Sequence, residues 1–487
     1  MNNESSPIFV VYDDREFTSE EVKPFVGDRR YSDIIFKRKK LKAYFYDYLS
    51  DIKKDHVFHI HNRHEVGELR KQIEDVGDPC GILIVSSKAG IISNGNFEQL
   101  LARLPFAEDS FCDRAFKPMI SFFKDSHELI EHWEKFQSKP LHSWEEPQTG
   151  MERLLSVQPL DLGKSRDFLS FMTGSTETRH FNQVEIDSFY YTKKSSDVRK
   201  MEAEYRFYDL VPEPMRPWLI QPFDYKRDGD TASYKMMRYY LADTALQWVH
   251  GAFSNASFEA FIDRLLFFIH QRPRKETNKS DVATVAKSLY LDKVESRAKQ
   301  LFDLPDGKKV NELVSIADPN LELNIQIERY KALYKKYEKE FHLNYLSAGH
   351  GDPCFSNILY DQQRYILKAI DPKGALTEED VWTHPYYDLC KISHSVMGNY
   401  DFINNGLYEV TLDDENGLIL KIKANQHLAK KELFLDKLKE LGYDWKIIRL
   451  GEASLFLSML PLHIDHPNKV MAFILIAKQI LDEVERA

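Results

Sequence analysis

The sequence predicts an α+β fold in which a small α/β domain precedes a larger region of strands and helices. In the first part, to about residue 140, short apolar runs alternate with helix-like segments, which is typical of an α/β layer. Beyond about residue 165, several strand patterns precede a long, largely helical stretch. We therefore expect domains at 1–140, 165–245 and 246–487, the last mainly helical.

Within the first domain, apolar runs at 8–12, 57–60 and 82–85 predict strands, and 41–49 and 65–76 predict helices. This order favours a parallel sheet. The first strand ends in Asp13 and Asp14, which could bind a metal, although an Asp in this position is more often a turn or cap. The segment 138–148 contains two prolines and a tryptophan, and it predicts a linker.

The most informative motif begins at His350 and runs His-Gly-Asp-Pro-Cys-Phe-Ser-Asn, which places Asp352 and Asn357 in one loop. Strand patterns at 358–360 and 365–370 follow, and the second one ends at Asp371. Phosphoryl transfer needs a carboxylate for the acceptor hydroxyl, and an amide and a carboxylate that hold magnesium on the phosphates. The motif supplies all three, whereas the alternative is a polar turn with a capping Asp and a buried His.

Over residues 165–487 the loop, the hairpin and the later Tyr-Tyr-Asp-Leu segment at 386–389 resemble the aminoglycoside phosphotransferase and choline kinase group. The resemblance implies a bilobal protein-kinase-like fold that uses ATP and Mg²⁺. It assigns the catalytic base to Asp352 and metal binding to Asn357 and Asp371. Within the same motifs, His350 and Asp388 become structural residues, with Asp388 bracing the loop or otherwise binding the acceptor.

The resemblance also directs attention to a predicted amino lobe. A hydroxyl-rich turn with Gly174, Ser175 and Thr176 lies between strand patterns at 171–173 and 184–186, and such a turn can place donors over phosphates. A third strand pattern begins at 189 and ends in Lys193 and Lys194, and Glu204 lies on the helix that follows. In kinases a strand Lys contacts the phosphates and pairs with a helix Glu. Strand alternation allows only one of these two lysines to point inward.

Further along the chain, a strand pattern at 233–239 corresponds to the hinge between the lobes, where Met237 could pack on the adenine base or belong to the core. Candidates for binding the acceptor are Lys373, His384 and His394, although a lone His is more often a packing residue. Amphipathic helices are expected at 321–342 and 470–484, and a strand pair at 407–412 and 417–422.

Composition narrows the function further. The net charge of −10 and a pI near 6.0 argue against binding to nucleic acid or an anionic membrane. We see no signal peptide and no membrane-spanning stretch, and the cysteines at 80, 112, 354 and 390 are too scattered for a disulfide framework or a zinc site. A cytoplasmic enzyme is therefore expected, with its oligomeric state left open.

The leading hypothesis is an ATP-dependent small-molecule kinase with a hydroxyl acceptor. A sugar or polyol of surface-polysaccharide metabolism, such as capsule biosynthesis, is at least as plausible as an amine, and GTP is not excluded as the donor. One alternative is a kinase-fold protein that binds a nucleotide or sugar to regulate or scaffold a partner. Another is a bifunctional nucleotidyltransferase-kinase, because the first domain faintly resembles a truncated sugar nucleotidyltransferase. That domain lacks the Gly-rich loop that such enzymes use on phosphates.

Overall fold

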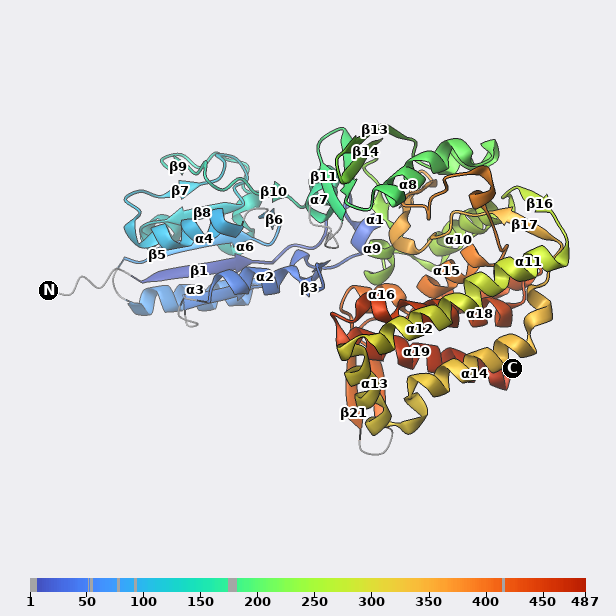
Figure 1. Cartoon of the computed structure of the whole chain (residues 1–487). Coiled ribbons are helices and arrows are strands. Elements are labelled where there is room, and N and C mark those ends of the chain that lie inside the picture. Colours follow the sequence, from blue (N-terminus) through green and yellow to red (C-terminus); the bar gives the residue numbers. More distant parts are fainter. Residues whose placement is uncertain are drawn as a thin grey trace. The chain divides into compact units, whose positions relative to one another are not determined.

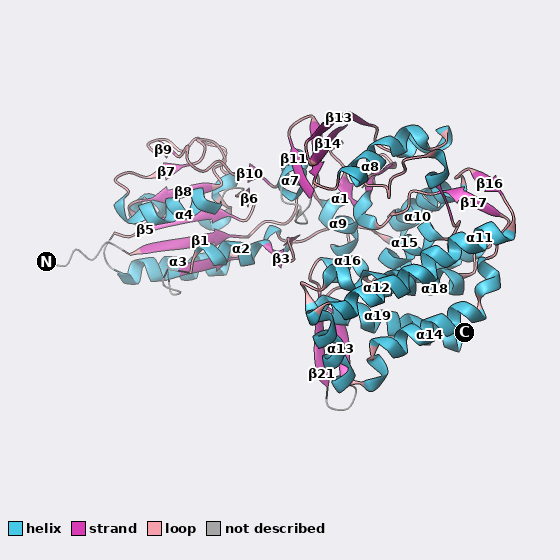
Figure 2. Ribbon diagram, viewed as in Figure 1, coloured by secondary structure: helices cyan, strands magenta, loops and turns pink. Residues whose placement is uncertain are grey.

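The structure is a computed structural model that describes residues 7–50, 52, 56–76, 79–91, 94–173, 182–413 and 417–487. The chain divides into two compact units, Met1–Thr176 and Glu177–Ala487 (Figure 1). The first unit is built on one larger sheet, and the second combines a small antiparallel sheet with a mainly helical part (Figure 2). The predicted α+β fold is confirmed.

The strands of the first unit are β1 (Ile8–Asp13), β2 (Ile35–Phe36), β3 (Lys39–Lys40), β4 (Val57–Ile60), β5 (Gly81–Ser86), β6 (Ala89–Gly90), β7 (Phe111–Cys112), β8 (Ile120–Phe123), β9 (Glu152–Arg153) and β10 (Leu160–Asp161). Its helices are α1 (Lys23–Val26), α2 (Leu41–Tyr48), α3 (Arg63–Val76), α4 (Asn94–Arg103), α5 (Ser126–Ile130), α6 (Trp133–Ser138) and α7 (Ser165–Thr173).

The main sheet of the first unit has the order β4-β1-β5-β8-β7-β9. Strands β4, β1 and β5 are parallel, as predicted, but β8 runs antiparallel to β5. The expectation of a wholly parallel sheet was wrong, because β7 and β8 are joined by a short connection and pair antiparallel.

Helices cover both faces of this sheet. Alternate residues of β1 enter different cores: Phe9 and Val11 pack with α3, α5 and α6, whereas Val10 and Tyr12 pack with α2 and α4. This alternation follows from the two-residue period of a strand.

Two predictions near the end of this unit were wrong. The segment 138–148 is not a linker, because Leu141 and Trp144 are buried in the core that contains α3 and α6. Residues 171–173 are not a strand but the end of α7, where Phe168 and Phe171, one helical turn apart, are both buried.

The strands of the second unit are β11 (Asn182–Ile186), β12 (Tyr190–Ser195), β13 (Pro222–Asp228), β14 (Thr231–Met237), β15 (Ala242–Asp243), β16 (Arg274–Glu276), β17 (Tyr345–Ala348), β18 (Ile358–Asp361), β19 (Ile366–Ala369), β20 (Trp382–Thr383), β21 (Tyr408–Asp413) and β22 (Gly417–Ile422). Its helices are α8 (Val198–Leu210), α9 (Thr244–Val249), α10 (Asn255–His270), α11 (Lys279–Ala286), α12 (Lys293–Asp303), α13 (Pro305–Ala317), α14 (Leu323–Lys336), α15 (Tyr387–Val396), α16 (Tyr400–Asn404), α17 (Leu428–Glu440), α18 (Trp445–Met459) and α19 (Pro467–Arg486).

The second unit begins with an antiparallel sheet of order β11-β12-β14-β13, on which α8 packs through Met201. Asp197 caps α8, since its side chain accepts the N–H of Lys200. The sheet and α8 share a small core of their own, and the helices from α9 onward share one large core. The predicted helices at 321–342 and 470–484 and the hairpin at 407–422 are present as α14, α19 and β21–β22.

Among the described residues, no helix combines the length and apolar character needed to cross a lipid bilayer.

Candidate active site

One buried carboxylate accepts hydrogen bonds from the backbone of the loop that contains the His-Gly-Asp motif. Asp388, in the first turn of α15, accepts the N–H groups of His350 at 2.9 Å and Gly351 at 2.8 Å. Arg272 donates to the same carboxylate at 2.6 Å, and both side chains are almost fully buried. A buried charge pair whose remaining acceptors are satisfied is stable and fixes the loop backbone. Asp388 therefore lies where the predicted bracing role requires it.

Asp352 projects from this loop, and its side chain is 40% exposed, which leaves it accessible to an acceptor. Lys391 lies 3.0 Å from one of its carboxylate oxygens. Desolvation raises the pKa of Asp352, but the charge and hydrogen bond of Lys391 outweigh this effect and hold the pKa below its usual value. Asp352 is therefore ionised near neutral pH and able to accept a hydrogen bond from a hydroxyl group.

Asn357 is oriented by the loop from which it comes. Its side-chain amide donates to the carbonyl oxygen of Asp352 at 2.9 Å, so its amide oxygen is directed away from that contact. The backbone continues from Asn357 into β18, and the carbonyl of Asn357 accepts the N–H of Ile370 at 2.9 Å. This last bond ties the loop to the residue directly before Asp371.

Asp371 lies two residues after β19, with its backbone in the left-handed region at φ 54°. Asp and Asn tolerate this conformation better than most residues. Its carboxylate is 3.1 Å from the ammonium group of Lys193. An amide oxygen on Asn357 and a carboxylate on Asp371 are the hard oxygen donors that Mg²⁺ prefers.

Lys193 is the inward-facing lysine of β12. Its ammonium group donates to Glu204 on α8 at 2.7 Å, and both side chains are almost fully buried. Tyr234 also donates to Glu204, at 2.9 Å. Burial alone would lower the pKa of Lys193, but the carboxylates of Asp371 and Glu204 raise it above its usual value. Lys194 is exposed on the opposite face of β12, so of these two lysines Lys193 is the one that faces Glu204 and Asp371.

The segment after Asp371 packs directly on α8. Gly374 has φ +88°, and a Cβ there would lie 2.8 Å from the carbonyl carbon of Ala203. Ala375 donates its N–H to the carbonyl of Ala203 at 3.0 Å. These contacts fix the distance between the backbone of Glu204 and the backbone of Asp371, which Lys193 bridges.

Two predicted acceptor residues are packing residues instead. His384 is fully buried and bonds the carbonyl of Phe341 and the hydroxyl of Tyr290, and burial lowers its pKa to about 4. His394 is 1% exposed and stacks on Tyr400 at 4.0 Å. Neither imidazole is accessible to an acceptor, so these predictions were wrong.

The remaining predicted residues fall into two groups. Lys373 is exposed beside the loop that contains the His-Gly-Asp motif, and Met237 is 51% exposed at the end of β14, whereas its neighbour Met236 belongs to the core of the antiparallel sheet. Both Lys373 and Met237 are therefore accessible to a ligand. Gly174, Ser175 and Thr176 lie outside the described residues.

Sequence reasoning missed Lys391 and Arg272. Lys391 follows Asp388 by three positions, so both side chains lie on one face of α15. Because Asp388 was predicted to contact the loop of the His-Gly-Asp motif, the shared face implies that Lys391 faces the same loop. This spacing could have identified Lys391. Arg272 lies after α10, far from the motif in sequence, and carried no local signal.

No family model and no curated protein matches the sequence. Among solved structures, the chain is similar to a thermostable mutant of the aminoglycoside phosphotransferase APH(4)-Ia in its apo form, with a TM-score of 0.37, 9% identity, and coverage of 65% of this chain and 98% of that chain. It is also similar to the spectinomycin phosphotransferase APH(9)-Ia in complex with ADP and spectinomycin, with a TM-score of 0.35, 12% identity, and coverage of 64% and 91%. Similarity at this level says nothing of the substrate, and the side chains described above carry the functional inference.

Proposed function

We propose that the second unit is an ATP-dependent small-molecule kinase that transfers the terminal phosphate to a hydroxyl group. The observation that carries the proposal is the Lys193 bridge, in which one ammonium group contacts both Glu204 and Asp371. It joins the antiparallel sheet to Asp371. The residue before Asp371 is in turn hydrogen-bonded to Asn357, in the loop that presents Asp352. Phosphoryl transfer depends on this positioning and on charge stabilisation rather than on covalent chemistry by the protein.

Each residue has a distinct task in this proposal. Lys193, fixed by Glu204, holds the nucleotide phosphates, and Asn357 and Asp371 hold Mg²⁺, which neutralises the charge on those phosphates when it is bound. Asp352 orients the acceptor hydroxyl and accepts its proton while the new phosphorus–oxygen bond forms and the bond to ADP breaks. The complete set of these residues favours catalysis over a purely regulatory or scaffolding role.

The charges around Asp352 bear on the acceptor. Lys391 contacts Asp352, and Lys293 donates to Tyr387 at 3.0 Å and also lowers the pKa of Asp352. Two ammonium groups disfavour a cationic acceptor at this position. A neutral or anionic sugar or polyol fits better, and we extend the proposal to one of surface-polysaccharide metabolism in the cytoplasm.

An ATP-consumption screen tests the proposal. It covers sugars, polyols, their phosphates and amino alcohols, in the presence of magnesium. With the acceptor that this screen identifies, we expect Asp352→Asn to lower kcat about 100-fold or more while MgATP affinity changes little. The matched control is Asp436→Asn, the same change at an exposed position of α17. Equal kcat for Asp352→Asn and wild type would remove Asp352 as the base.

A further inference from the structure

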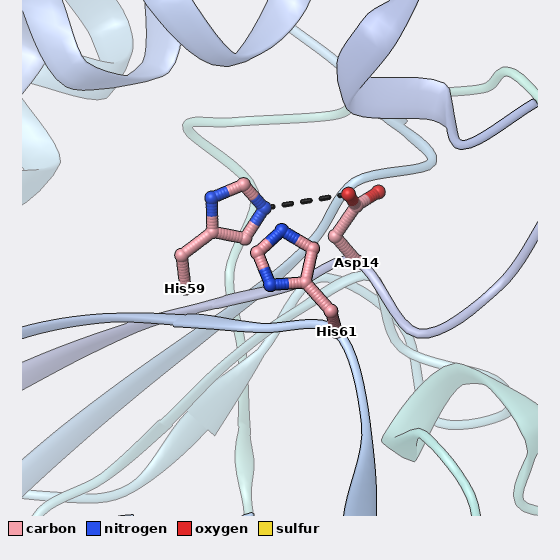
Figure 3. Close-up of side chains that lie close together, drawn as sticks. All are labelled: Asp14, His59 and His61. Atoms are coloured by element: carbon pink, nitrogen blue, oxygen red, sulfur yellow. Dashed lines mark hydrogen bonds and ion pairs between the residues drawn. The ribbon is translucent and has the colours of Figure 1, made fainter. Parts of the chain in front are cut away.

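Three potential metal ligands lie together at one edge of the sheet in the first unit. They are Asp14, His59 and His61 (Figure 3), and one ligand atom from each lies within 4.8 Å of the other two. Asp14 directly follows β1, and the two histidines lie at the end of β4 and just after it. This cluster is separate from the residues to which the proposed kinase function assigns magnesium.

The strand register explains why they meet. Strands β1 and β4 are parallel neighbours with Tyr12 opposite His59 and Asp13 opposite Ile60, and the N–H of Asp14 continues the ladder to the carbonyl of Ile60 at 2.8 Å. Residues two apart in a strand share a face. Asp14 therefore lies on the face of Tyr12, and His61 lies on the face of His59. Asp13 points to the other face, where Arg15 donates to it at 2.7 and 2.8 Å.

The side chains are already aimed at a common point. His59 Nε2 lies 3.3 Å from a carboxylate oxygen of Asp14, and the two imidazole rings stack with centroids 3.9 Å apart. In Figure 3 both rings lie beside the Asp14 carboxylate. Ligand atoms of a tetrahedral metal at ordinary bond lengths are about 3.3 Å apart. Since the His61 side chain is 36% exposed, a small rotation of its ring is enough to reach this spacing.

Neighbouring polar groups hold the atoms that face away from this point. His59 Nδ1 bonds the hydroxyl of Tyr46 at 2.9 Å, and His61 Nδ1 lies 3.3 Å from Glu65. Ser32 donates to Asp14 at 2.6 Å. Partners of this kind on the second nitrogen of an imidazole fix its orientation and direct the other nitrogen toward a metal. Both histidines thus have Nε2 directed into the cluster.

Because the carboxylate of Asp14 is buried, a bound cation would stabilise it. Its carboxylate is fully buried, and it is contacted by the hydroxyl and N–H groups of Ser32 and by the imidazole of His59. The guanidinium group of Arg30 donates to the backbone carbonyl of Asp14 instead of to this carboxylate. A buried carboxylate is costly unless a positive charge compensates it. The His59 side chain is 13% exposed, which together with the exposure of His61 leaves a path for an ion.

We propose that Asp14, His59 and His61 bind a divalent transition-metal ion such as Zn²⁺. Two imidazoles and one carboxylate favour Zn²⁺, Co²⁺ or Fe²⁺ over Mg²⁺, which prefers oxygen donors alone. Three protein ligands leave at least one coordination position for water or for a small anionic or hydroxyl ligand.

The test is a titration of the full chain with Co²⁺, monitored by its visible absorption, and with Zn²⁺, monitored by calorimetry. All proteins carry Asp371→Asn, so that metal binding at the proposed kinase site is weakened in every sample. We expect one site in the parent protein, and about 100-fold or more loss of affinity in His59→Ala and in His61→Ala. His64→Ala is the control, because His64 is 83% exposed on α3 and faces Glu68. Equal affinity in the parent and the two ligand variants overturns the proposal.

A second measurement separates metal loss from misfolding. Thermal unfolding of the same proteins is recorded with EDTA and with Zn²⁺. A bound metal raises the unfolding temperature of the parent and of His64→Ala, and His61→Ala should unfold at the parent's EDTA temperature with or without Zn²⁺. A Zn²⁺-dependent rise in His61→Ala equal to that of the parent contradicts the site, as does the absence of any rise in the parent.

Discussion

In the first unit, the proposed metal ligands come from the ends of two adjacent parallel strands, whereas in the second unit the proposed kinase residues come from a strand, a helix and two loops. The register of β1 and β4 alone brings Asp14 to the histidines. In the second unit, by contrast, the contact between Lys193 and Asp371 depends on tertiary packing. The segment after Asp371 must pack against α8 at Gly374, and Asp388 must hold the loop of the His-Gly-Asp motif in place.

The two sites also balance charge differently. Glu204 and Asp388 are as deeply buried as Asp14, but each forms an ion pair with a buried Lys or Arg. Asp14 contacts a hydroxyl group and an imidazole. Where a buried carboxylate is paired with a Lys or Arg, its charge is already compensated, and a metal is not required for stability. A buried carboxylate that has no such partner is stabilised when a metal ion binds to it. We therefore expect metal to affect stability in the first unit and nucleotide binding in the second.

The largest effect is expected for Asp371→Asn. Asn keeps the left-handed backbone, which has φ 54° at this position, and removes only the charge. Affinity for MgATP should fall about 100-fold or more, because the ion that bridges to the phosphates loses its carboxylate ligand. Calorimetry with MgATP measures this, with Asp436→Asn, the same change at an exposed position of α17, as the control. If Asp371→Asn binds MgATP as tightly as wild type, Asp371 is not the ligand.

A pair of neighbouring lysines gives the second prediction. Lys193→Met should lower kcat/KM for ATP and destabilise the second unit by about 3 kcal/mol. Glu204 would lose its buried cation and keep only Lys200, which is half-exposed and 3.7 Å away. Lys194→Met, the same change on the exposed face, should alter stability by less than about 0.5 kcal/mol. Urea unfolding and steady-state kinetics measure both.

A double variant separates the two effects of Lys193. Adding Glu204→Gln to Lys193→Met removes the uncompensated charge, so stability should recover while activity stays low. Recovery of activity as well would show that Lys193 serves only to neutralise Glu204. Equal destabilisation by Lys193→Met and Lys194→Met would contradict the assignment of the inward-facing lysine.

The sequence predicted the parts of the fold and site that depend on local pattern. Each of these parts is a single continuous stretch of sequence, and the structure has each of them at the predicted residues. They are strands β1, β4 and β5, helices α2 and α3, and the loop with Asp352 and Asn357. Strand alternation predicted that only one of the two lysines points inward, but not which one. That choice depends on the position of α8 and Glu204.

The predictions that were wrong concern features that depend on packing between segments far apart in the sequence. His384 and His394 lie close in sequence to the site, yet the large helical core buries both. The prolines and the tryptophan at 138–148 predicted a linker, but Trp144 is buried in the core that contains α3 and α6. The cluster of Asp14, His59 and His61 has no motif spacing, since its members meet only through the register of β1 and β4.

The smallest effect is expected at Asp401, a carboxylate in α16 that is 1% exposed. Burial raises its pKa to about 7. Since an Asp in the unfolded chain titrates near its ordinary pKa of 3.8, the native state binds more protons than the unfolded state between these pH values, and stability falls as pH rises through that window. Asp401→Asn removes this titration.

The stability difference between Asp401→Asn and wild type should therefore grow in favour of the variant from pH 5 to pH 8, by a few kcal/mol at most. His384, whose pKa burial lowers to about 4, costs stability as pH falls below its usual range, but it does so equally in both proteins and cancels in the difference. Thermal unfolding of both proteins at each pH measures the effect. A constant difference would mean that Asp401 is already ionised in the native state at pH 5, and that burial does not raise its pKa into this window.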